Sequence, residues 1–356
     1  MKFIHIADVH WGMTPDNDKY WSKERTQAIK DTFTQVIEEA RKRSVDCLFI
    51  AGDMFHRQPL ARDLKEINYL FSTIPATKVV MIAGNHDRIR NNSAVLSFQW
   101  APNVTYMLEE DLTSVYFPEI NTEVYGFSYH TQEITENRID DIEVPDNRRI
   151  HVLLAHGGDS QHLPFDKKAL ALTNFSYFAL GHIHNPQVLV ENRMVFPGSL
   201  EPLDKTETGA HGMYVGEINQ VTRQVTSLEF VPMAKMQYIP LVVNVSTATT
   251  NTELAMRISQ EVQKRGVDNV YRFRIRGMRD PEIDFDLDIL SDRLRIVEII
   301  DESEPQYDFS ALFAQHPSDM IGFYIQALQK QDMSQVEKKA LYYGINALLR
   351  TTDERS

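Results

Sequence analysis

Five short apolar runs of this 356-residue chain each end in a cluster of Asp, Asn or His residues. The first three clusters are Asp8-Val9-His10, Gly52-Asp53 and Gly84-Asn85-His86-Asp87. The last two are His156-Gly157-Gly158 and Gly181-His182-Ile183-His184. Carboxylate, amide oxygen and imidazole groups are suitable ligands for Mn²⁺, Mg²⁺, Fe²⁺ or Zn²⁺. The clusters therefore predict a site for divalent metal ions.

The apolar runs that precede these clusters are typical of buried strands, because each is four to seven residues long and ends at turn-forming residues. They cover residues 2–7, 46–51, 78–83, 149–155 and 177–180. Ligand sites of α/β sheets lie at the carboxyl ends of strands, so we expect the five clusters to converge. Two metals about 3.5–4 Å apart, bridged by one carboxylate, would clamp a phosphodiester and generate a hydroxide between them.

Helical patterns alternate with the first strands, and this alternation indicates an α/β domain. Helices are expected over residues 22–43, 63–72 and 93–100. After residue 122 strands dominate, with candidates at residues 123–129, 193–196, 212–218 and 224–231.

A smaller β-α-β-β unit follows Pro232. Its predicted strands are residues 238–245, 270–276 and 294–300, and its helix, residues 253–265, is expected to be capped by Thr252. Two helices should end the chain, one starting near Ser318 and one behind a Ser334/Glu337 capping box. We therefore expect three parts: a catalytic domain (1–232), a capping domain (236–305) and a helical segment (306–356).

The composition is that of a globular protein, with 42% hydrophobic and 24% charged residues. The single cysteine, Cys47, excludes a disulfide scaffold and indicates a reducing compartment. No apolar stretch approaches the roughly 18 residues of a membrane span, and the start has no signal-peptide pattern, so we expect a cytoplasmic protein without a membrane partner. The net charge is −13, but residues 280–308 hold 11 acidic residues and two arginines. This local acidity does not exclude DNA as a partner.

The five clusters, in this order, resemble the signature of the calcineurin-like metallophosphoesterase superfamily. Within it the chain is similar to DNA double-strand-break repair nucleases of the SbcD and YhaO type. The motifs that support this similarity lie at residues 2–12, 52–56, 126–130 and 197–202. The resemblance is strong to about residue 232 and loose beyond. It implies an α/β fold, namely a β-sandwich flanked by helices, with a small α/β capping domain and C-terminal helices.

The resemblance also implies a role for each residue of the clusters. One metal would be held by Asp8, His10, Asp53 and His184. The second would be held by Asp53, Asn85, His156 and His182, which makes Asp53 the bridge. Mn²⁺ is the expected ion, with Mg²⁺, Fe²⁺ or Zn²⁺ as alternatives.

Three further residues are expected to act beside the metals. His86 would stabilise the pentacovalent phosphate or protonate the leaving 3′ oxygen, because a cationic imidazole can do either. Asp87 would hold the His86 ring, and His56 is similar to a family histidine that helps to place the DNA strand.

Two groups of arginines are candidates for contact with phosphates. Arg57, Arg88 and Arg90 follow the second and third clusters. Arg272, Arg274 and Arg276 alternate with apolar residues and so share one face of a predicted strand of the capping domain. An exposed sheet face without a ligand is the competing interpretation for this second group.

Apolar residues recur at helical spacing in both C-terminal helices. The resemblance implies that they dock on the coiled coil of an SMC-like ATPase; packing within the chain and homodimerisation are the alternatives. The candidate partner-binding residues are Ile321, Tyr324, Ile325, Leu328, Leu341, Ile345 and Leu348. Homodimerisation through the helices near residues 63–72 and 91–100 is also expected by resemblance.

These observations favour a two-metal DNA nuclease, an exonuclease on duplex ends and an endonuclease on single strands. It would be the nuclease subunit of an SbcCD-like or YhaO/YhaN-like repair complex. A phosphodiesterase or phosphatase that acts on small nucleotides or phosphoproteins would use the same metal chemistry. In a third hypothesis the metals only shape the binding surface of an adaptor.

Overall fold

The computed structural model describes residues 1–145, 148–287 and 294–353. The chain divides into two compact units, Met1–Tyr238 and Ile239–Ser356. The sequence-based division into three functional parts, at 232 and at 305, stays a prediction.

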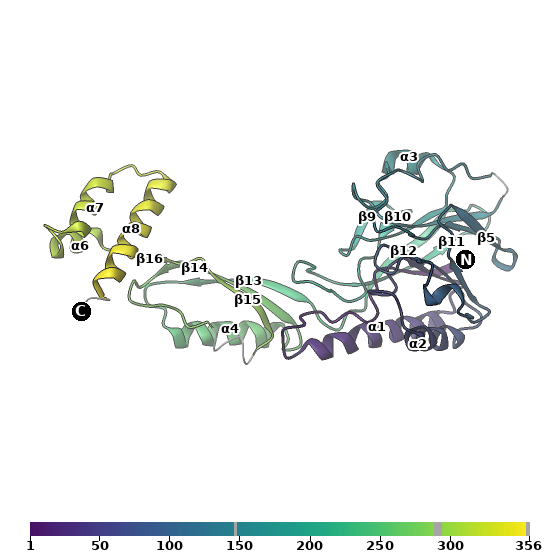
Figure 1. Cartoon of the computed structure of the whole chain (residues 1–356), viewed down its shortest axis with the longest axis horizontal. Helices are drawn as coiled ribbons and strands as arrows, with labels where there is room; N and C mark the ends of the chain where they lie inside the picture. The colour runs from purple at the N-terminus through teal and green to yellow at the C-terminus, as the bar shows by residue number, and fades with distance from the viewer. Residues whose placement is uncertain (146–147, 288–293, 354–356) are drawn as a thin grey trace. The chain divides into compact units, whose positions relative to one another are not determined.

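Two six-stranded sheets form the first unit (Figure 1). The order in the first sheet is β12 (Val225–Pro232), β11 (Gly212–Ile218), β1 (Lys2–Ile6), β2 (Cys47–Ala51), β3 (Lys78–Ile82) and β4 (Val104–Met107). The order in the second is β5 (Thr113–Phe117), β6 (Thr122–Gly126), β7 (Ile150–His156), β8 (Tyr177–Gly181), β10 (Met194–Phe196) and β9 (Gln187–Val190). Strands β1 to β4 run parallel, and so do β6, β7, β8 and β10. The expected sandwich is therefore observed.

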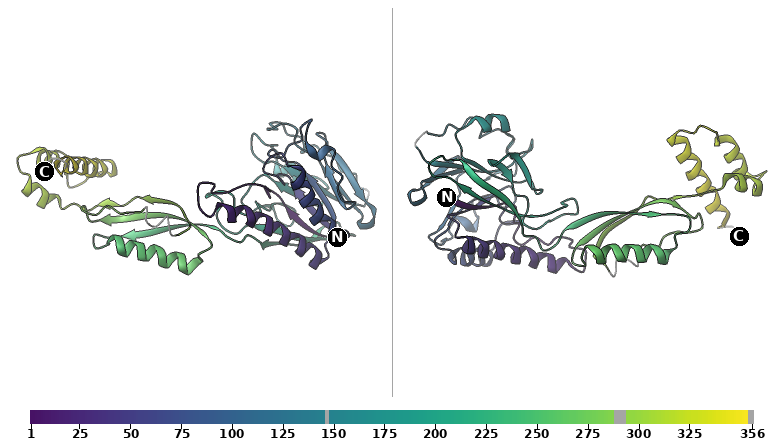
Figure 2. Two further views of the ribbon diagram at one scale, coloured as in Figure 1. Left: turned by 60° about the horizontal axis from the view of Figure 1, so that its bottom comes forward. Right: turned by 180° about the vertical axis from the view of Figure 1, so that it is seen from behind.

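The strands that end in the polar clusters are mainly apolar because both of their faces are buried. Phe49 of β2 and Leu154 of β7 belong to the core between the two sheets. Leu48 and Ile50 face the other way, toward α1 (Ser22–Arg43) and α2 (Ala61–Ser72), which cover the first sheet (Figures 1 and 2). Cys47 also lies in the core between the sheets, and burial raises the pKa of its thiol, as expected for an unreactive cysteine.

The helix expected over residues 93–100 is wrong. The structure has a single 3₁₀ turn there, η1 (Ala94–Leu96). Val95 is buried, and Phe98 and Trp100 pack against the same core from an irregular segment. Their spacing reflects three separate contacts with the core and not a helical stripe. Elsewhere in the first unit, short elements that were not predicted include η2 (Pro118–Ile120) and α3 (Lys167–Leu172).

The second unit begins with the expected β-α-β-β arrangement. Its strands β13 (Tyr238–Val245), β14 (Val270–Arg279) and β15 (Ile296–Asp301) form one sheet, and β16 (Glu304–Pro305) pairs with β14. Helix α4 (Asn251–Arg265) covers one face of this sheet (Figure 2). Its cap is Thr250 and not Thr252, because the Thr250 hydroxyl accepts the Glu253 N–H. Residues 288–293 of the acidic segment lie outside the described residues.

The described part of the chain ends with three helices, α6 (Phe309–Gln315), α7 (Met320–Leu328) and α8 (Gln335–Asp353). The first was not predicted. Helix α7 begins near Ser318 as expected, and its cap is Asp319, whose carboxylate accepts two N–H groups of the first turn. The Ser334/Glu337 capping box of α8 is confirmed by reciprocal side-chain to backbone hydrogen bonds.

Close contact between the two sheets brings the polar strand ends together at Gly181, the last residue of β8. A Cβ atom at this position would lie 1.9 Å from the carbonyl oxygen of Ala51 and 2.9 Å from the Cβ of Ala7. Strands β8, β1 and β2 therefore approach closely at their carboxyl ends because residue 181 has no side chain.

We predict that Gly181→Ala destabilises the protein by about 1–3 kcal/mol, the usual cost of overpacking a core. Urea unfolding measures this loss. Gly126→Ala is the matched control at the end of β6, where the nearest atom to the new Cβ would be the Ile82 Cγ2 at 3.0 Å. Equal stability losses in the two variants would contradict the importance of the contact at Gly181.

Candidate metal centre

Four of the predicted ligand residues have left-handed backbone conformations, which are rare for residues other than glycine. The φ angles are 51° at Asp8, 50° at His10, 49° at Asp53 and 97° at His182. Such conformations cost free energy and cluster at functional sites. Here they turn the chain sharply at the ends of β1, β2 and β8, so the side chains point into one space.

Asp53 lies at the centre of this space and is 1% exposed. Its Oδ1 accepts the backbone N–H of His86 at 2.9 Å. Its Oδ2 lies 3.7 Å from His10 Nε2 and 3.4 Å from His156 Nε2. His156 Nε2 is also 3.0 Å from Asn85 Oδ1. One carboxylate oxygen thus faces a member of each predicted ligand set, as a bridging ligand must.

The donor atoms of His184 and Asp8 complete the group next to His10. The Nε2 atoms of His10 and His184 are 3.2 Å apart, and His184 Nε2 is 3.8 Å from Asp8 Oδ1. Ligands at about 2.1 Å from a metal in tetrahedral or octahedral geometry lie about 3.0–3.4 Å from one another. The observed spacing fits a divalent ion with a modest contraction of the donor atoms.

In three of the histidines, one ring nitrogen contacts an oxygen atom of the protein. The other ring nitrogen is left for a metal. His156 Nδ1 contacts a main-chain carbonyl of β2 at 2.9 Å. His182 Nε2 lies 2.8 Å from the Asp159 carboxylate, and His184 Nδ1 lies 2.7 Å from that of Glu207. Metal-binding histidines in proteins are usually fixed in this manner. The chemistry of the donor set therefore fits two divalent ions.

The glycine of the Gly84-Asn85-His86-Asp87 cluster has a steric role. A Cβ atom at Gly84 would lie 2.3 Å from Asp53 Oδ1 and 2.6 Å from His156 Nε2. Any larger residue would displace two of the predicted ligands, so the cluster needs glycine at this position.

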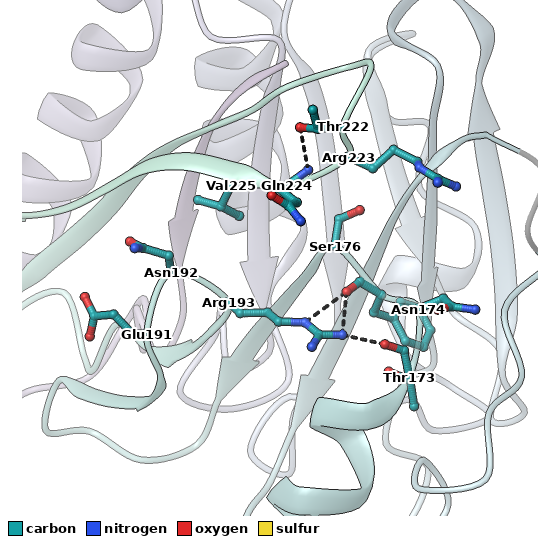
Figure 3. Close-up of a pocket in the computed structure, with 11 residues that line it drawn as sticks. Thr173, Asn174, Ser176, Glu191, Asn192, Arg193, Thr222, Arg223, Gln224 and Val225 are labelled. Carbon is teal, nitrogen blue, oxygen red and sulfur yellow. Dashed lines mark hydrogen bonds between the residues drawn. The ribbon is translucent and has the colours of Figure 1, made fainter.

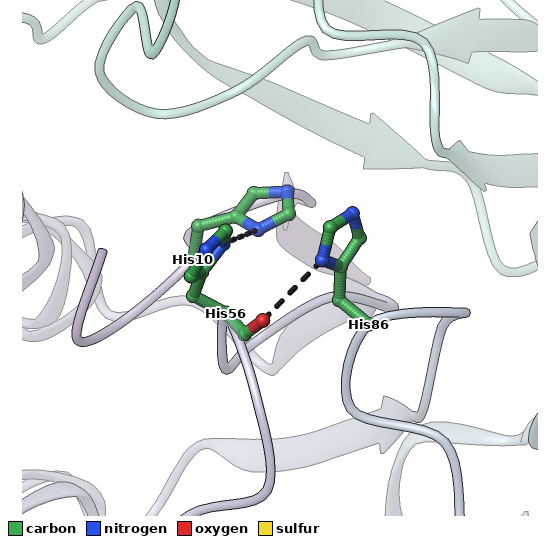
Figure 4. A group of neighbouring side chains, drawn as sticks. All are labelled: His10, His56 and His86. Atoms are coloured by element: carbon green, nitrogen blue, oxygen red, sulfur yellow. Dashed lines mark hydrogen bonds between the residues drawn. The ribbon is translucent and has the colours of Figure 1, made fainter. Parts of the chain in front are cut away.

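Figure 4 shows His10, His56 and His86, which come from three different loops. The His56 and His86 rings stack at 5.2 Å between centroids, and the Nδ1 atoms of His56 and His10 are 3.3 Å apart. His86 is exposed, and its Nδ1 is 3.3 Å from the main-chain oxygen of His56. The structure thus places both predicted catalytic histidines beside the ligand group.

The role expected for Asp87 needs correction. Its carboxylate accepts the backbone N–H groups of Gly84 at 2.8 Å and Phe55 at 3.1 Å. Asp87 therefore ties together the loops after β2 and β3. The His86 ring is held by the carbonyl of His56, so the predicted Asp87–His86 pair is replaced by two loop contacts.

Burial and neighbouring charges act in opposite directions on the ligand residues. Burial opposes a charge on His156, but the Asp53 carboxylate outweighs it and raises the pKa of His156 to about 9. Burial likewise opposes a charge on His184, and Glu207 raises its pKa to about 9. Burial raises the pKa of Asp8 to about 6. Burial also acts to raise the pKa of Asp53, but His156 and the other nearby imidazoles outweigh it and hold this pKa well below its usual range.

The first group of arginines lies close to the ligand loops. Arg88 donates to the carbonyl oxygen of Asn85 at 3.2 Å and so supports the loop that carries this ligand. Arg57 and Arg90 have exposed side chains. Contact with DNA phosphates stays a prediction for all three.

The second group of arginines consists of Arg272, Arg274 and Arg276. These residues share one face of β14 as predicted, but each is paired with a carboxylate. Arg272 pairs with Glu298. Arg274 and Arg276 both pair with Glu302, at 2.8 and 2.7 Å. The face is therefore less positive than its arginines alone suggest.

The seven candidate partner-binding residues of the C-terminal helices pack within the chain, which was the alternative interpretation. Ile321 and Ile325 of α7 pack against Leu341 and Ile345 of α8, and all four are buried. The other three candidates, Tyr324, Leu328 and Leu348, pack around this core. Packing within the chain is thus observed for these residues, and contact with an SMC-like ATPase stays a prediction.

A surface pocket of about 510 Å³ is lined by residues 173–176, 191–193 and 222–225, none of which is a predicted site residue (Figure 3). Its Arg193 donates to the carbonyl oxygens of Ala171, Thr173 and Phe175. These contacts secure the end of α3, so the cation has a structural role.

Sequence reasoning missed the two carboxylates that hold the histidines. Asp159 follows the His156-Gly157-Gly158 cluster directly, and this position could have identified it. Glu207 lies 23 residues after His184 in an irregular loop, where no periodicity or spacing marks it.

A family model described as calcineurin-like phosphoesterase matches residues 1–186, which is more than half of the chain. The chain belongs to this family. The family and the donor set define a phosphoester hydrolase that uses divalent metal ions.

Curated relatives extend the similarity beyond the matched region. The chain is 26% identical over 300 residues to the uncharacterized metallophosphoesterase YhaO of Bacillus subtilis, covering 78% of this chain and 72% of YhaO. It is 27% identical to the DNA double-strand break repair protein Mre11 of Methanopyrus kandleri, covering 72% of this chain and 62% of that protein. The Mre11 of Methanocaldococcus jannaschii is 26% identical, with 58% of each chain covered. The chain thus spans about three fifths of these Mre11 proteins.

Among solved structures, TT1561 of Thermus thermophilus has a TM-score of 0.38 and 11% identity over 64% of this chain and 98% of its own. A dimetal phosphatase from Danio rerio has the same TM-score, with 13% identity over 61% of this chain and 92% of its own. Among the described residues, no helix has the length and apolar character that a membrane crossing requires.

We predict that Mn²⁺ affinity rises between pH 7 and 8.5. His156 and His184, with pKa values of about 9, are protonated at pH 7 without metal, and each displaced proton adds about tenfold in affinity per pH unit. Calorimetric titration in buffers of different ionisation enthalpy measures both the affinity and the protons released. Glu207→Gln should reduce the number of protons released by about one. Affinity that does not change over this pH range would contradict the assignment.

Proposed function

We propose that the chain is a two-metal DNA nuclease, an exonuclease on duplex ends and an endonuclease on single strands. The observation that carries this proposal is the set of donor atoms 3.0–3.8 Å apart around Asp53, with exposed His86 at its edge. The Mre11 relatives, which are named as DNA double-strand break repair proteins, support DNA as the substrate.

In this proposal the residues divide into the two ligand sets expected from the sequence. Asp8, His10, Asp53 and His184 would hold one ion, and Asp53, Asn85, His156 and His182 the other. Two such ions, proposed to be Mn²⁺, would polarise the phosphodiester and activate the attacking water. Because Asp8 and Asp53 are the only carboxylates in these sets, the occupied centre would attract a phosphodiester.

The histidines at the edge would then act on the substrate. The His56 carbonyl holds His86 through Nδ1, which leaves Nε2 of the exposed ring for the phosphate or the leaving 3′ oxygen. A cationic imidazole there can donate a proton to that oxygen. His56, stacked on His86, would help to place the strand.

A second candidate, hydrolysis of small nucleotides or phosphoproteins, is favoured by the ion pairs of Arg272, Arg274 and Arg276 with glutamates. A cap with few available cations would contribute little to the binding of a long polyanion. Faster turnover of bis-p-nitrophenyl phosphate or cyclic nucleotides than of DNA would favour this candidate.

The complex with an SMC-like ATPase, the homodimer and the cytoplasmic location are further parts of the proposal. Because four of the seven predicted partner-binding residues, namely Ile321, Ile325, Leu341 and Ile345, are buried, a coiled-coil partner would contact other sides of α7 and α8. Met320 and Phe323 of α7 and Val336 and Tyr343 of α8 are more than half exposed there. Exposed Leu60 and Tyr69, at α2, would lie in the dimer interface.

We predict that purified protein with Mn²⁺ cleaves linear DNA and that two variants lose this activity for different reasons. Asp53→Ala should lose metal and cleavage together. His86→Ala should keep both ions but cleave about 10²–10⁴-fold more slowly, the usual contribution of a general acid. Metal content and cleavage rate are measured on the same samples, with His316→Ala in the C-terminal unit as a control. No cleavage by wild type, or full cleavage by either variant, would contradict the proposal.

The capping domain allows a second prediction. Glu302→Gln should strengthen DNA binding several-fold because it releases Arg274 and Arg276 from their shared carboxylate. Fluorescence anisotropy at fixed salt measures the affinity. Glu261→Gln, which removes the partner of Arg265 on α4, is the matched control with the same charge change. Equal affinities of the two variants would indicate that the arginine face does not contact DNA.

A further inference from the structure

The turn that follows β7 places two polar side chains against His182, outside the predicted ligand sets. Asp159 Oδ2 lies 2.8 Å from His182 Nε2. His162 Nδ1 lies 3.1 Å from both oxygens of the same carboxylate. The His162 and His182 rings are 4.3 Å apart between centroids, so the three side chains form one compact group.

The turn itself fixes the carboxylate. Asp159 Oδ1 accepts the backbone N–H groups of Gln161 and His162, both at 2.8 Å. Gly158 N donates to the carbonyl of His162 at 2.7 Å, and this close approach depends on a residue without a side chain at Gly157. With Oδ1 engaged by its own turn, the carboxylate directs Oδ2 toward His182.

A carboxylate in this position decides which nitrogen of His182 carries the proton. An ionised carboxylate only accepts hydrogen bonds, so His182 Nε2 must be the N–H nitrogen. Nδ1 then has the free electron pair that a metal requires. The His182 ring also lies 5.2 Å from that of His156, and its backbone N–H donates to Asp8 at 2.9 Å. Backbone and ring are thus fixed by different partners.

We propose that Asp159, supported by His162, is the positioning residue that presents Nδ1 of His182 to the second metal. The proposal rests on the two-metal function given above and adds two residues to it. Asp159 and His162 would hold the ring without touching the substrate.

Asp159→Asn tests this directly. The asparagine oxygen can still accept the N–H groups of the turn, while its amide now donates toward His182 Nε2. This favours the tautomer with the proton on Nδ1, the nitrogen needed by the metal. Calorimetric titration with MnCl₂ should show one of the two ions bound about 10–100-fold more weakly, the usual effect of losing such a partner. Ser160→Ala, an exposed change in the same turn, should bind both ions as wild type does.

Nitrogen NMR of the metal-free protein gives a second measurement that does not depend on activity. It should find the His182 proton on Nε2 in wild type and on Nδ1 in Asp159→Asn. His162→Phe keeps the carboxylate and should show a smaller loss of affinity in the same direction. The inference is overturned if Asp159→Asn keeps the wild-type tautomer or binds both ions with wild-type affinity. Because the tautomer is read without metal, this result is separate from a failure of the proposed function, in which wild type would bind fewer than two ions.

Discussion

The buried carboxylate of Asp53 requires compensation for its negative charge, and most of the site is arranged to supply it. An isolated carboxylate removed from water costs several kcal/mol even after the protein relaxes. Here the backbone N–H of His86 and the imidazoles of His10 and His156 surround it. Together with Asp53 itself, these groups come from the ends of four strands in two sheets, β1, β2, β3 and β7, so the charge is tolerated only when the sandwich is assembled.

The same charge compensation explains how the ligand side chains can lie close together without metal and can still bind a metal ion. Without an ion, His156 and His184 are held in the cationic form by Asp53 and Glu207. A divalent cation would replace these protons at nearly the same positions, so little rearrangement is needed. The outer carboxylates Asp159 and Glu207 keep the rings oriented in both states.

The sequence was sufficient for the parts of the fold that are buried on both sides. The strand before each polar cluster was predicted to within one or two residues, since a continuous apolar run bounded by glycine or a polar residue leaves few alternatives. The prediction was wrong for the segment with Val95 and Trp100. These residues contact the core one by one from an irregular segment, so their helical spacing does not reflect a helix. For the site, the clusters identified the residues that converge. The contacts of Asp87 with the Phe55 backbone, of Arg274 with Glu302 and of Ile321 with α8 could not be predicted, because each joins segments that are distant in sequence.

The proposed function depends on a bridge between two metal ions through Asp53. Anomalous diffraction at the manganese edge, from crystals grown with Mn²⁺, measures it most directly. We expect two anomalous peaks about 3.5–4 Å apart, with the Asp53 carboxylate in contact with both. A single peak, or two peaks that do not share Asp53, would contradict it.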